Sequence, residues 1–198
     1  MVHMAIPELV FVFSGKRKSG KDFVASLLQQ NFTQSRCGIM RLSEPLKKQY
    51  ALENKLAYEQ LLDSSSYKEK FRADMIKWGE EKRDKEPDYF CRLATSFRLT
   101  SEANKPIWII SDARRPTDIE YFHRNYPNQV RTVRIIADES VRQQRGFHFV
   151  AGVDDAVSEC GLDSFQHWDF IITNNGDANQ LNSQIKAMIQ SIPLTAKL

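Results

Sequence analysis

Residues 15–22 read GKRKSGKD, a loop with two glycines and four basic residues. Residues 9–13 before it, LVFVF, form a continuous apolar run, as expected for a strand buried on both faces of a parallel sheet. After it, apolar residues recur at helical spacing at Phe23, Val24, Leu27 and Leu28. A Gly-x4-Gly-Lys loop between such a strand and such a helix stands in the order that a phosphate-binding loop requires. The context therefore favours a nucleotide-binding loop over a lysine-rich turn exposed to water.

The chemistry of this loop follows from its backbone. Successive N–H groups of a Gly-x4-Gly-Lys loop wrap the β-phosphate, and the following helix adds the positive end of its dipole. Gly15 and Gly20 are expected to permit the backbone angles and the close approach. Lys21 is expected to reach the β- and γ-phosphates.

The eighth position of the loop departs from the usual pattern, because Asp22 stands where most such loops carry Ser or Thr as a magnesium ligand. A carboxylate brings a full negative charge close to the phosphates, which requires surplus cations around it. Lys16, Arg17 and Lys18 are expected to supply them from within the loop. Asp22 is interpreted as holding magnesium, directly or through water, or as orienting a neighbouring lysine. A carboxylate favoured there by the helix dipole alone is the alternative.

The rest of the chain places this loop in an α/β fold. Further strands are predicted at residues 38–42, 107–110, 130–137 and 169–173. A mostly helical region is predicted at residues 46–100, with one helix near 67–83. Strands that alternate with helices indicate a parallel sheet, five-stranded here, in a three-layer arrangement. At 198 residues the chain is predicted to form a single domain, 1–198.

The composition of the chain disfavours several classes of function. The net charge of +3 is too small to indicate a nucleic-acid surface. The three cysteines lie far apart, which is typical of reduced thiols, and the four histidines are scattered, which disfavours a histidine-ligated metal. No apolar run approaches the roughly 18–20 residues that span a bilayer, so no membrane association is expected. The final Ala196-Lys197-Leu198 is one residue away from the Ser-Lys-Leu peroxisomal address, so a peroxisomal location stands beside the cytosol as an expectation.

Charged residues follow the predicted strand at 107–110. Asp112 closes that strand, at a place where folds of this kind hold magnesium through an acidic residue. Arg114 and Arg115 come next, at the carboxyl end of the strand, where open α/β sheets bind ligands. We expect the two arginines to contact phosphate, against the alternative of a solvated loop.

The predicted helix at 67–83 carries a second group of cations. Lys68, Arg72 and Arg83 share one helix stripe with Gly79 between them. This arrangement suits an anionic acceptor, and it fits an ordinary solvated helix face equally well. Together with residues up to about 100, this helix is predicted to form an acceptor-binding helical region at 44–100.

A short lid is predicted at residues 138–152. Arg142 and Arg145 lie three apart and are expected on one side of a short helix, with Gly146 and Gly152 as hinges. Such a lid supplies positive charge to the transition state of phosphotransferases. The chain offers many cations and no evident acid–base dyad, and transfer to an ionised phosphate needs charge and alignment rather than a base. The sequence therefore indicates phosphoryl transfer onto a phosphate.

With these residues in hand, the chain closely resembles the animal-type phosphomevalonate kinase family. The resemblance rests on segments that follow one another in the family's order, namely FSGKRKSGKDF, RLSEPLKKQYA, YKEKFRADMIKWGEEKR, SDARR, RQQRG and GVDDAVSECGLD. It implies a small P-loop kinase of the nucleoside-monophosphate-kinase type. The implied reaction transfers the γ-phosphate of ATP, with Mg²⁺, to mevalonate 5-phosphate in isoprenoid and sterol synthesis. Such a protein is expected to be a monomer in the cytosol or the peroxisome.

The resemblance also implies roles for single residues. The residues implied to bind ATP are Gly15, Lys16, Arg17, Lys18, Ser19, Gly20, Lys21, Asp22, Arg145, Asn175, Gln180 and Gln184. Those implied to bind the acceptor are Lys47, Lys68, Arg72, Arg83, Arg114, Arg115 and Asn174. Those expected to act in catalysis are Lys18, Lys21, Arg114 and Arg145, and the residues expected at magnesium are Asp22 and Asp112.

Two other functions are the alternatives. One is a kinase for a nucleoside monophosphate on the same fold. The other is a regulatory GTP-binding module, because residues 174–177, NNGD, imitate the spacing of a guanine-reading Asn-Lys-x-Asp. That segment lacks the lysine, and both Asp22 and the absence of Asp-x-x-Gly after the strand at 107–110 disfavour it.

Overall fold

The structure, a computed structural model, describes residues 6–62, 66–96 and 100–193. Five strands form one parallel sheet in the order β2-β3-β1-β4-β5. Their bounds are Leu9–Ser14 for β1, Cys37–Met40 for β2, Ile107–Ile110 for β3, Val130–Ile136 for β4 and Phe170–Thr173 for β5. All five predicted strands are therefore confirmed, with bounds that differ by at most two residues.

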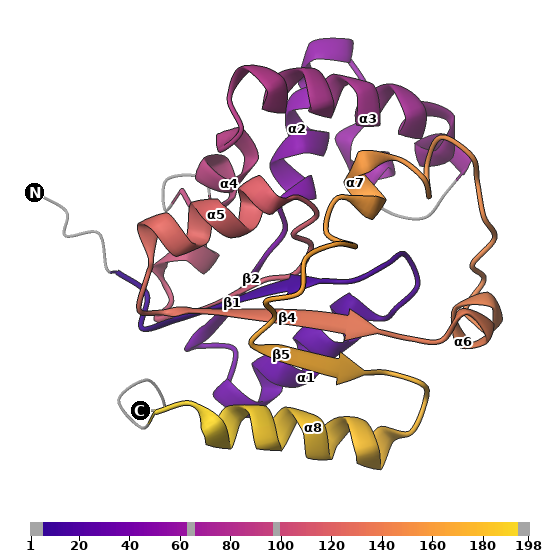
Figure 1. Cartoon of the computed structure of the whole chain (residues 1–198). Coiled ribbons are helices and arrows are strands. Elements are labelled where there is room, and N and C mark those ends of the chain that lie inside the picture. Colours follow the sequence, from indigo (N-terminus) through magenta and orange to yellow (C-terminus); the bar gives the residue numbers. More distant parts are fainter. Residues whose placement is uncertain (1–5, 63–65, 97–99, 194–198) are drawn as a thin grey trace, which may run out of the picture.

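The central strand β1 is buried along its whole length because both sheet faces are covered (Figure 1). On one face, α1 (Lys21–Phe32) and α8 (Ala178–Ser191) pack against Phe11 and Phe13. On the other face, α4 (Tyr89–Ala94) and α5 (Pro116–Asn125) pack against Val10 and Val12. This is the predicted three-layer arrangement. The sequence of β1 does not alternate between apolar and polar residues, because neither face of this strand meets water.

A separate helical layer lies beyond α4 and α5. It consists of α2 (Ser43–Asn54), a short 3-10 helix (Tyr58–Leu61) and α3 (Ser66–Lys85). These elements share a small core of their own, made by Tyr50, Ala51, Leu61 and Met75. Figure 1 shows α2 and α3 at the far side of the molecule from α8. The helix predicted near 67–83 is confirmed as α3.

The chain between β4 and β5 runs along the edge of the molecule. It contains α6 (Glu139–Gln144) and the one-turn helix α7 (Val157–Cys160), and in Figure 1 it passes from beside the sheet up toward α3. A 3-10 turn, Ser101–Asn104, precedes β3. Within the described ranges, no helix combines the length and the apolar character needed to cross a membrane. The tripeptide at 196–198, on which the peroxisomal expectation rested, lies outside the described residues.

The strand order fixes where a ligand site can form. From β1 the chain moves outward to β2, returns to β3 beside β1, and then crosses to β4 on the other side of β1. The connections thus leave β1 in opposite directions, and open α/β sheets bind ligands at the carboxyl ends of strands where this reversal occurs. The loop after β1 and the segment after β3 both lie at this edge.

Candidate functional site: a phosphate-binding loop beside a cationic cavity

The loop between β1 and α1 has the backbone that its glycines were predicted to allow. Gly20 has a φ of +88°, in the left-handed region, and Lys18 has a φ of +65°. A Cβ atom on Gly20 would lie 2.3 Å from Nδ2 of Asn174, and one on Gly15 would lie 2.5 Å from the carbonyl oxygen of Ile135. No side chain fits at either position without displacing these atoms, so sterics require glycine at both, and at Gly20 the backbone angle requires it as well.

This loop leaves backbone donors open at the start of α1. In the part of the chain that the structure describes, no hydrogen bond uses the N–H of Lys18, Gly20 or Lys21. Open N–H groups at the N-terminus of a twelve-residue helix, together with the helix dipole, attract an anion. The local geometry therefore agrees with the predicted phosphate loop.

Two residues from distant elements fasten the loop from behind. Asn174, directly after β5 and only 4% exposed, donates from Nδ2 to the carbonyl oxygen of Ser19 at 2.9 Å. Arg145, directly after α6, donates from Nη1 to the carbonyl oxygens of Ser19 at 3.2 Å and Lys18 at 3.4 Å. Its Nη2 donates to the carbonyl oxygen of Asn174 at 2.9 Å. The predicted lid arginine thus lies against the nucleotide loop.

A cavity of about 610 Å³ opens in front of the loop. Lys21 and Asp22 line it from α1, and Asp112 and Arg114 line it from the segment after β3. Lys47 of α2 and Lys68 of α3 line the opposite wall. A second cavity, of about 160 Å³, shares Lys47, Lys68, Asp112 and Arg114 with the first, so the two adjoin.

Two lysines of the large cavity, Lys21 and Lys47, form no direct ion pair with any described residue. No ion pair or hydrogen bond within the described residues uses the ammonium group of Lys21 or of Lys47. Burial, and secondarily the nearby Arg114, lowers the pKa of Lys21 to about 8 against the pull of Asp22 and Asp112. Burial also lowers the pKa of Lys47. Two desolvated cations that line the same cavity favour a ligand with several negative charges.

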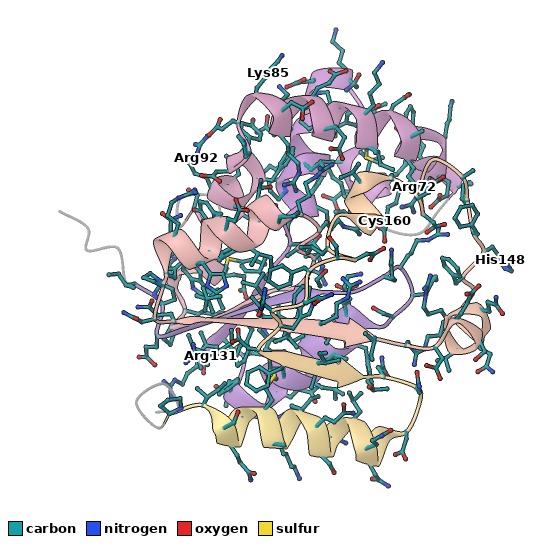
Figure 2. All side chains as sticks on the ribbon, in the orientation of Figure 1. Arg72, Lys85, Arg92, Arg131, His148 and Cys160 are labelled. Atoms are coloured by element: carbon teal, nitrogen blue, oxygen red, sulfur yellow. The ribbon has the colours of Figure 1, made fainter. Side chains whose placement is uncertain are left out.

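All six cations predicted to bind the acceptor line this junction or the smaller cavity. Arg72 and Arg83 of α3 and Arg115 at the start of α5 join the others around the smaller cavity. Figure 2 labels Arg72 on α3 and Cys160 at the end of α7, and residues of both helices, Arg72 and Glu159 among them, line this cavity. The helix stripe that fitted a solvated face equally well in the sequence therefore faces the cavity.

Four acidic residues that were not among the predicted site residues pair with these cations. Nε of Arg72 donates to Oε2 of Glu69 at 2.7 Å, and Nη1 of Arg83 donates to Oδ1 of Asp118 at 2.5 Å. Arg114 pairs with Glu159, and Arg115 pairs with Glu80. A signal for Asp118 exists in the sequence, because it stands three residues after Arg115 at a helix start, where an acidic side chain caps the backbone. Glu159 lies 45 positions from Arg114, and no local pattern marks it.

The two carboxylates predicted at magnesium line the same large cavity. Asp112 accepts the N–H of Leu42 on Oδ1 at 2.6 Å and that of Ser43 on Oδ2 at 3.1 Å. Asp22 has a side chain that is 67% exposed. One or two carboxylates beside phosphate oxygens and water are a donor set that Mg²⁺ accepts. These residues fit the ion, with Asp112 able to reach it through water while it holds the start of α2.

The prediction that cations of the loop offset the charge of Asp22 is wrong for Lys16 and Arg17. Lys16 donates to the carbonyl oxygen of Glu159 at 3.0 Å and pairs with Asp163 at 2.5 Å. Arg17 pairs with Asp154 at 2.8 Å. The partner of Asp22 is instead Arg41, after β2, whose Nε lies 3.3 Å from Oδ1.

The first two cations of the loop bind residues of the segment at 148–163. Asp22 lies in the first turn of α1 and pairs with a residue that follows β2 instead. Lys18 is exposed at the tip of the loop. Arg41 lines the large cavity with Asp22, so it belongs to the site although its sequence context did not reveal it.

The remaining predicted contacts lie behind or beside the loop. Asn174 does not appear among the residues that line either cavity described above, and its amide holds the loop instead. Asn175 exchanges hydrogen bonds with Asp138 at 2.9 and 2.8 Å. Gln180 is exposed in the first turn of α8, and the side chain of Gln184 bonds both backbone groups of Thr173 at 2.9 Å. Their roles toward the substrates stay predictions.

Comparison with known proteins agrees with this geometry. The solved structure "TT1252 from Thermus thermophilus" superposes with a TM-score of 0.54 at 14% identity, covering 95% of this chain and 100% of that one, which supports the fold alone. The sequence model of the family described as "Phosphomevalonate kinase" matches residues 13–128. The curated "Phosphomevalonate kinase" of Drosophila melanogaster is 39% identical over 173 residues, 86% of this chain and 90% of the relative. The matched residues include the loop and most of the cavity wall, and the chain belongs to the phosphomevalonate kinase family.

Proposed function

We propose that this protein transfers the γ-phosphoryl group of ATP to mevalonate 5-phosphate, giving mevalonate 5-diphosphate and ADP. The observation that carries the proposal is the smaller cavity lined by six cations, which adjoins the large cavity in front of the phosphate loop at Lys47, Lys68 and Arg114. A phosphate loop alone supports ATP use, and the adjoining cations extend this to an acceptor that is itself an anion. The name of the acceptor rests on the family and on the Drosophila relative.

The chemistry requires alignment and charge rather than a base. An oxygen of the acceptor phosphate forms a bond to the γ-phosphorus while the bond to the bridging oxygen of ADP breaks, and no proton has to leave the ionised nucleophile. Lys21, which lines the large cavity at the start of α1, would neutralise charge on the moving phosphoryl group. Lys47, Lys68 and Arg114 are placed to hold the acceptor phosphate in line.

Several parts of this assignment are inferred from the family. We propose that Asp22 and Asp112 hold Mg²⁺, which would neutralise the β- and γ-phosphate oxygens. We further propose one kinase domain over 1–198, with an acceptor-binding helical region at 44–100 and a lid at 138–152 that brings Arg145 to ATP. A monomer in the cytosol or the peroxisome completes the proposal.

An acceptor screen tests the function. The purified protein is incubated with ATP and Mg²⁺ and with one acceptor at a time, and ADP formation is measured together with the mass of the phosphorylated product. Mevalonate 5-phosphate is expected to be turned over, and AMP, UMP and unphosphorylated mevalonate are expected to give at most trace activity. Turnover of a nucleoside monophosphate with none of mevalonate 5-phosphate would refute the proposal in favour of the nucleotide kinase.

A further inference from the structure

One carboxylate, that of Asp118, contacts three arginine residues that line the smaller cavity. Asp118, the third residue of α5, has no exposed surface and does not line the cavity itself. Its Oδ1 accepts from Nη1 of Arg83 at 2.5 Å. Its Oδ2 accepts the backbone N–H of Arg114 at 2.9 Å and that of Arg115 at 3.1 Å. The two oxygens thus hold one side chain and two backbone groups at the same time.

The side-chain half of this arrangement is desolvated. The side chain of Arg83 is only 11% exposed, and its guanidinium lies 5.0 Å from the centre of the Phe90 ring. Oδ1 of Asp118 also lies 3.5 Å from Sγ of Cys91, a buried residue of α4. Breaking a buried ion pair strongly destabilises a protein, because it leaves an uncompensated charge. The pair with Asp118 therefore holds the guanidinium of Arg83 in one position.

The backbone half fixes the turn from which the other two arginines project. Bonds from the N–H groups of Arg114 and Arg115 to one oxygen close this turn against the start of α5. The side chains of both residues then leave the turn at the cavity wall, where Arg115 also pairs with Glu80 of α3. Asp118 therefore connects α3, which supplies Arg83, with the carboxyl edge of the sheet, which supplies Arg114.

We propose that Asp118 is a positioning residue for the acceptor: it sets the relative placement of Arg83, Arg114 and Arg115 without touching the substrate. This inference rests on the proposed function, because it requires that these arginines bind the phosphate or the carboxylate of the acceptor. A group that merely caps α5 would affect stability and both substrates alike. A positioning group affects the acceptor selectively, because the phosphate loop takes its shape from Asn174 and Arg145 instead.

The test is steady-state kinetics of Asp118→Asn in the full chain, with both substrates varied. Asparagine keeps the size of the side chain but removes its charge and turns one acceptor into a donor, which then faces either the Arg83 guanidinium or the two backbone N–H groups. We expect the KM for the acceptor to rise at least about tenfold while the KM for ATP changes less than about twofold. An unchanged acceptor KM, or an equal rise of both KM values, would overturn the proposal.

Asp169→Asn is the matched control. Its Oδ2 also accepts a backbone N–H, that of Thr132 at 2.7 Å, and the Thr132 hydroxyl at 2.9 Å, but it does so at the amino end of β5 and away from both cavities. We expect this variant to lower the melting temperature with both KM values preserved. A selective rise of its acceptor KM would show that any lost carboxylate contact has this effect, and would count against Asp118.

A double variant tests whether Asp118 acts through the side chain of Arg83, separately from its backbone contacts. Because Asp118 acts partly through Arg83, the acceptor KM of Asp118→Asn combined with Arg83→Gln should rise less than the product of the two single effects. Independent, multiplying effects would contradict the side-chain half. If Asp118→Asn does not fold, Arg83→Lys in the otherwise intact chain takes its place, and an acceptor KM within about twofold of wild type would overturn the proposal.

The proposed function and this inference fail in different ways. Wild-type turnover identifies the acceptor before any variant is made, and the variants are then assayed with the acceptor that the wild type uses. A wild type that phosphorylates another anion would refute mevalonate 5-phosphate as the substrate and leave the role of Asp118 to be judged on that anion.

Discussion

Replacing Lys21 by methionine is expected to abolish turnover and, near neutral pH, to raise the stability of the ligand-free protein. The half-buried side chain lines the large cavity, no ion pair within the described residues uses its ammonium group, and desolvation lowers its pKa from 10.5 to about 8. This difference corresponds to roughly 3 kcal/mol that the folded protein loses by keeping the lysine charged. Methionine has a similar length and no charge, so it removes the cost.

The sign of the pH dependence follows from the direction of the pKa change. The folded pKa of Lys21 lies below the unfolded one, so the penalty is fully present below about pH 8. Between about pH 8 and 10.5 the unfolded chain still binds the proton and the folded protein does not, so the penalty disappears as the pH rises. The advantage of the methionine variant should shrink over this interval.

Denaturant unfolding of both proteins at about pH 7 and about pH 10 measures this effect. We expect Lys21→Met to be more stable by about 1–3 kcal/mol at the lower pH, and the gap to narrow at the higher pH. Its kcat should fall by about a thousandfold or more, because charge on the transferred group is no longer neutralised. A less stable variant at pH 7, or a gap that does not depend on pH, would refute the reasoning.

Lys18→Met is the matched control, because Lys18 lies exposed in the same loop. Its effect on the free energy of unfolding should stay within about 0.5 kcal/mol at either pH. A large change at this position would mean that the loop as a whole, rather than the buried charge of Lys21, sets the stability.

Three further changes probe other parts of the site. Arg145→Met should lower kcat by about a hundredfold or more with an unchanged circular dichroism spectrum, and near-normal turnover would remove Arg145 from the site. Gly20→Ala should raise the KM for ATP at least about tenfold and lower the melting temperature, because its φ is +88° and a Cβ would lie 2.3 Å from Asn174; a wild-type KM would contradict this. Asp22→Asn should raise the Mg²⁺ concentration for half-maximal rate about tenfold, and an unchanged Mg²⁺ dependence would leave Asp22 only its contact with Arg41.

Local patterns made part of this protein predictable. The order of β1, the loop and α1 is written within 24 consecutive residues, Leu9–Phe32, and both glycines carry steric requirements that only glycine meets. The strands are recognisable because a sheet covered on both faces needs short, continuous apolar runs. The cations of α3 follow from helical spacing, although the sequence could not tell whether their stripe faced water or a cavity.

Long-range electrostatics accounts for what the sequence did not reveal. Asp22 and Arg41 are 19 positions apart, Arg83 and Asp118 are 35 apart, and Arg114 and Glu159 are 45 apart. Each pairing depends on how strands and helices are arranged in space, and no spacing rule encodes it. For the same reason Lys16 and Arg17, which look like surplus charge within their loop, prove to be committed to Asp163 and Asp154.

The helices α2 and α3 are packed around Tyr50, Ala51, Leu61 and Met75, apart from the two clusters that hold the sheet. The protein is therefore modular in an evolutionary sense. Substitutions inside that small cluster or on the cavity side of α3 can reshape the acceptor pocket while the nucleotide half keeps its own packing. The part of the cavity wall that α2 and α3 supply can therefore change without repacking of the sheet that holds the phosphate loop.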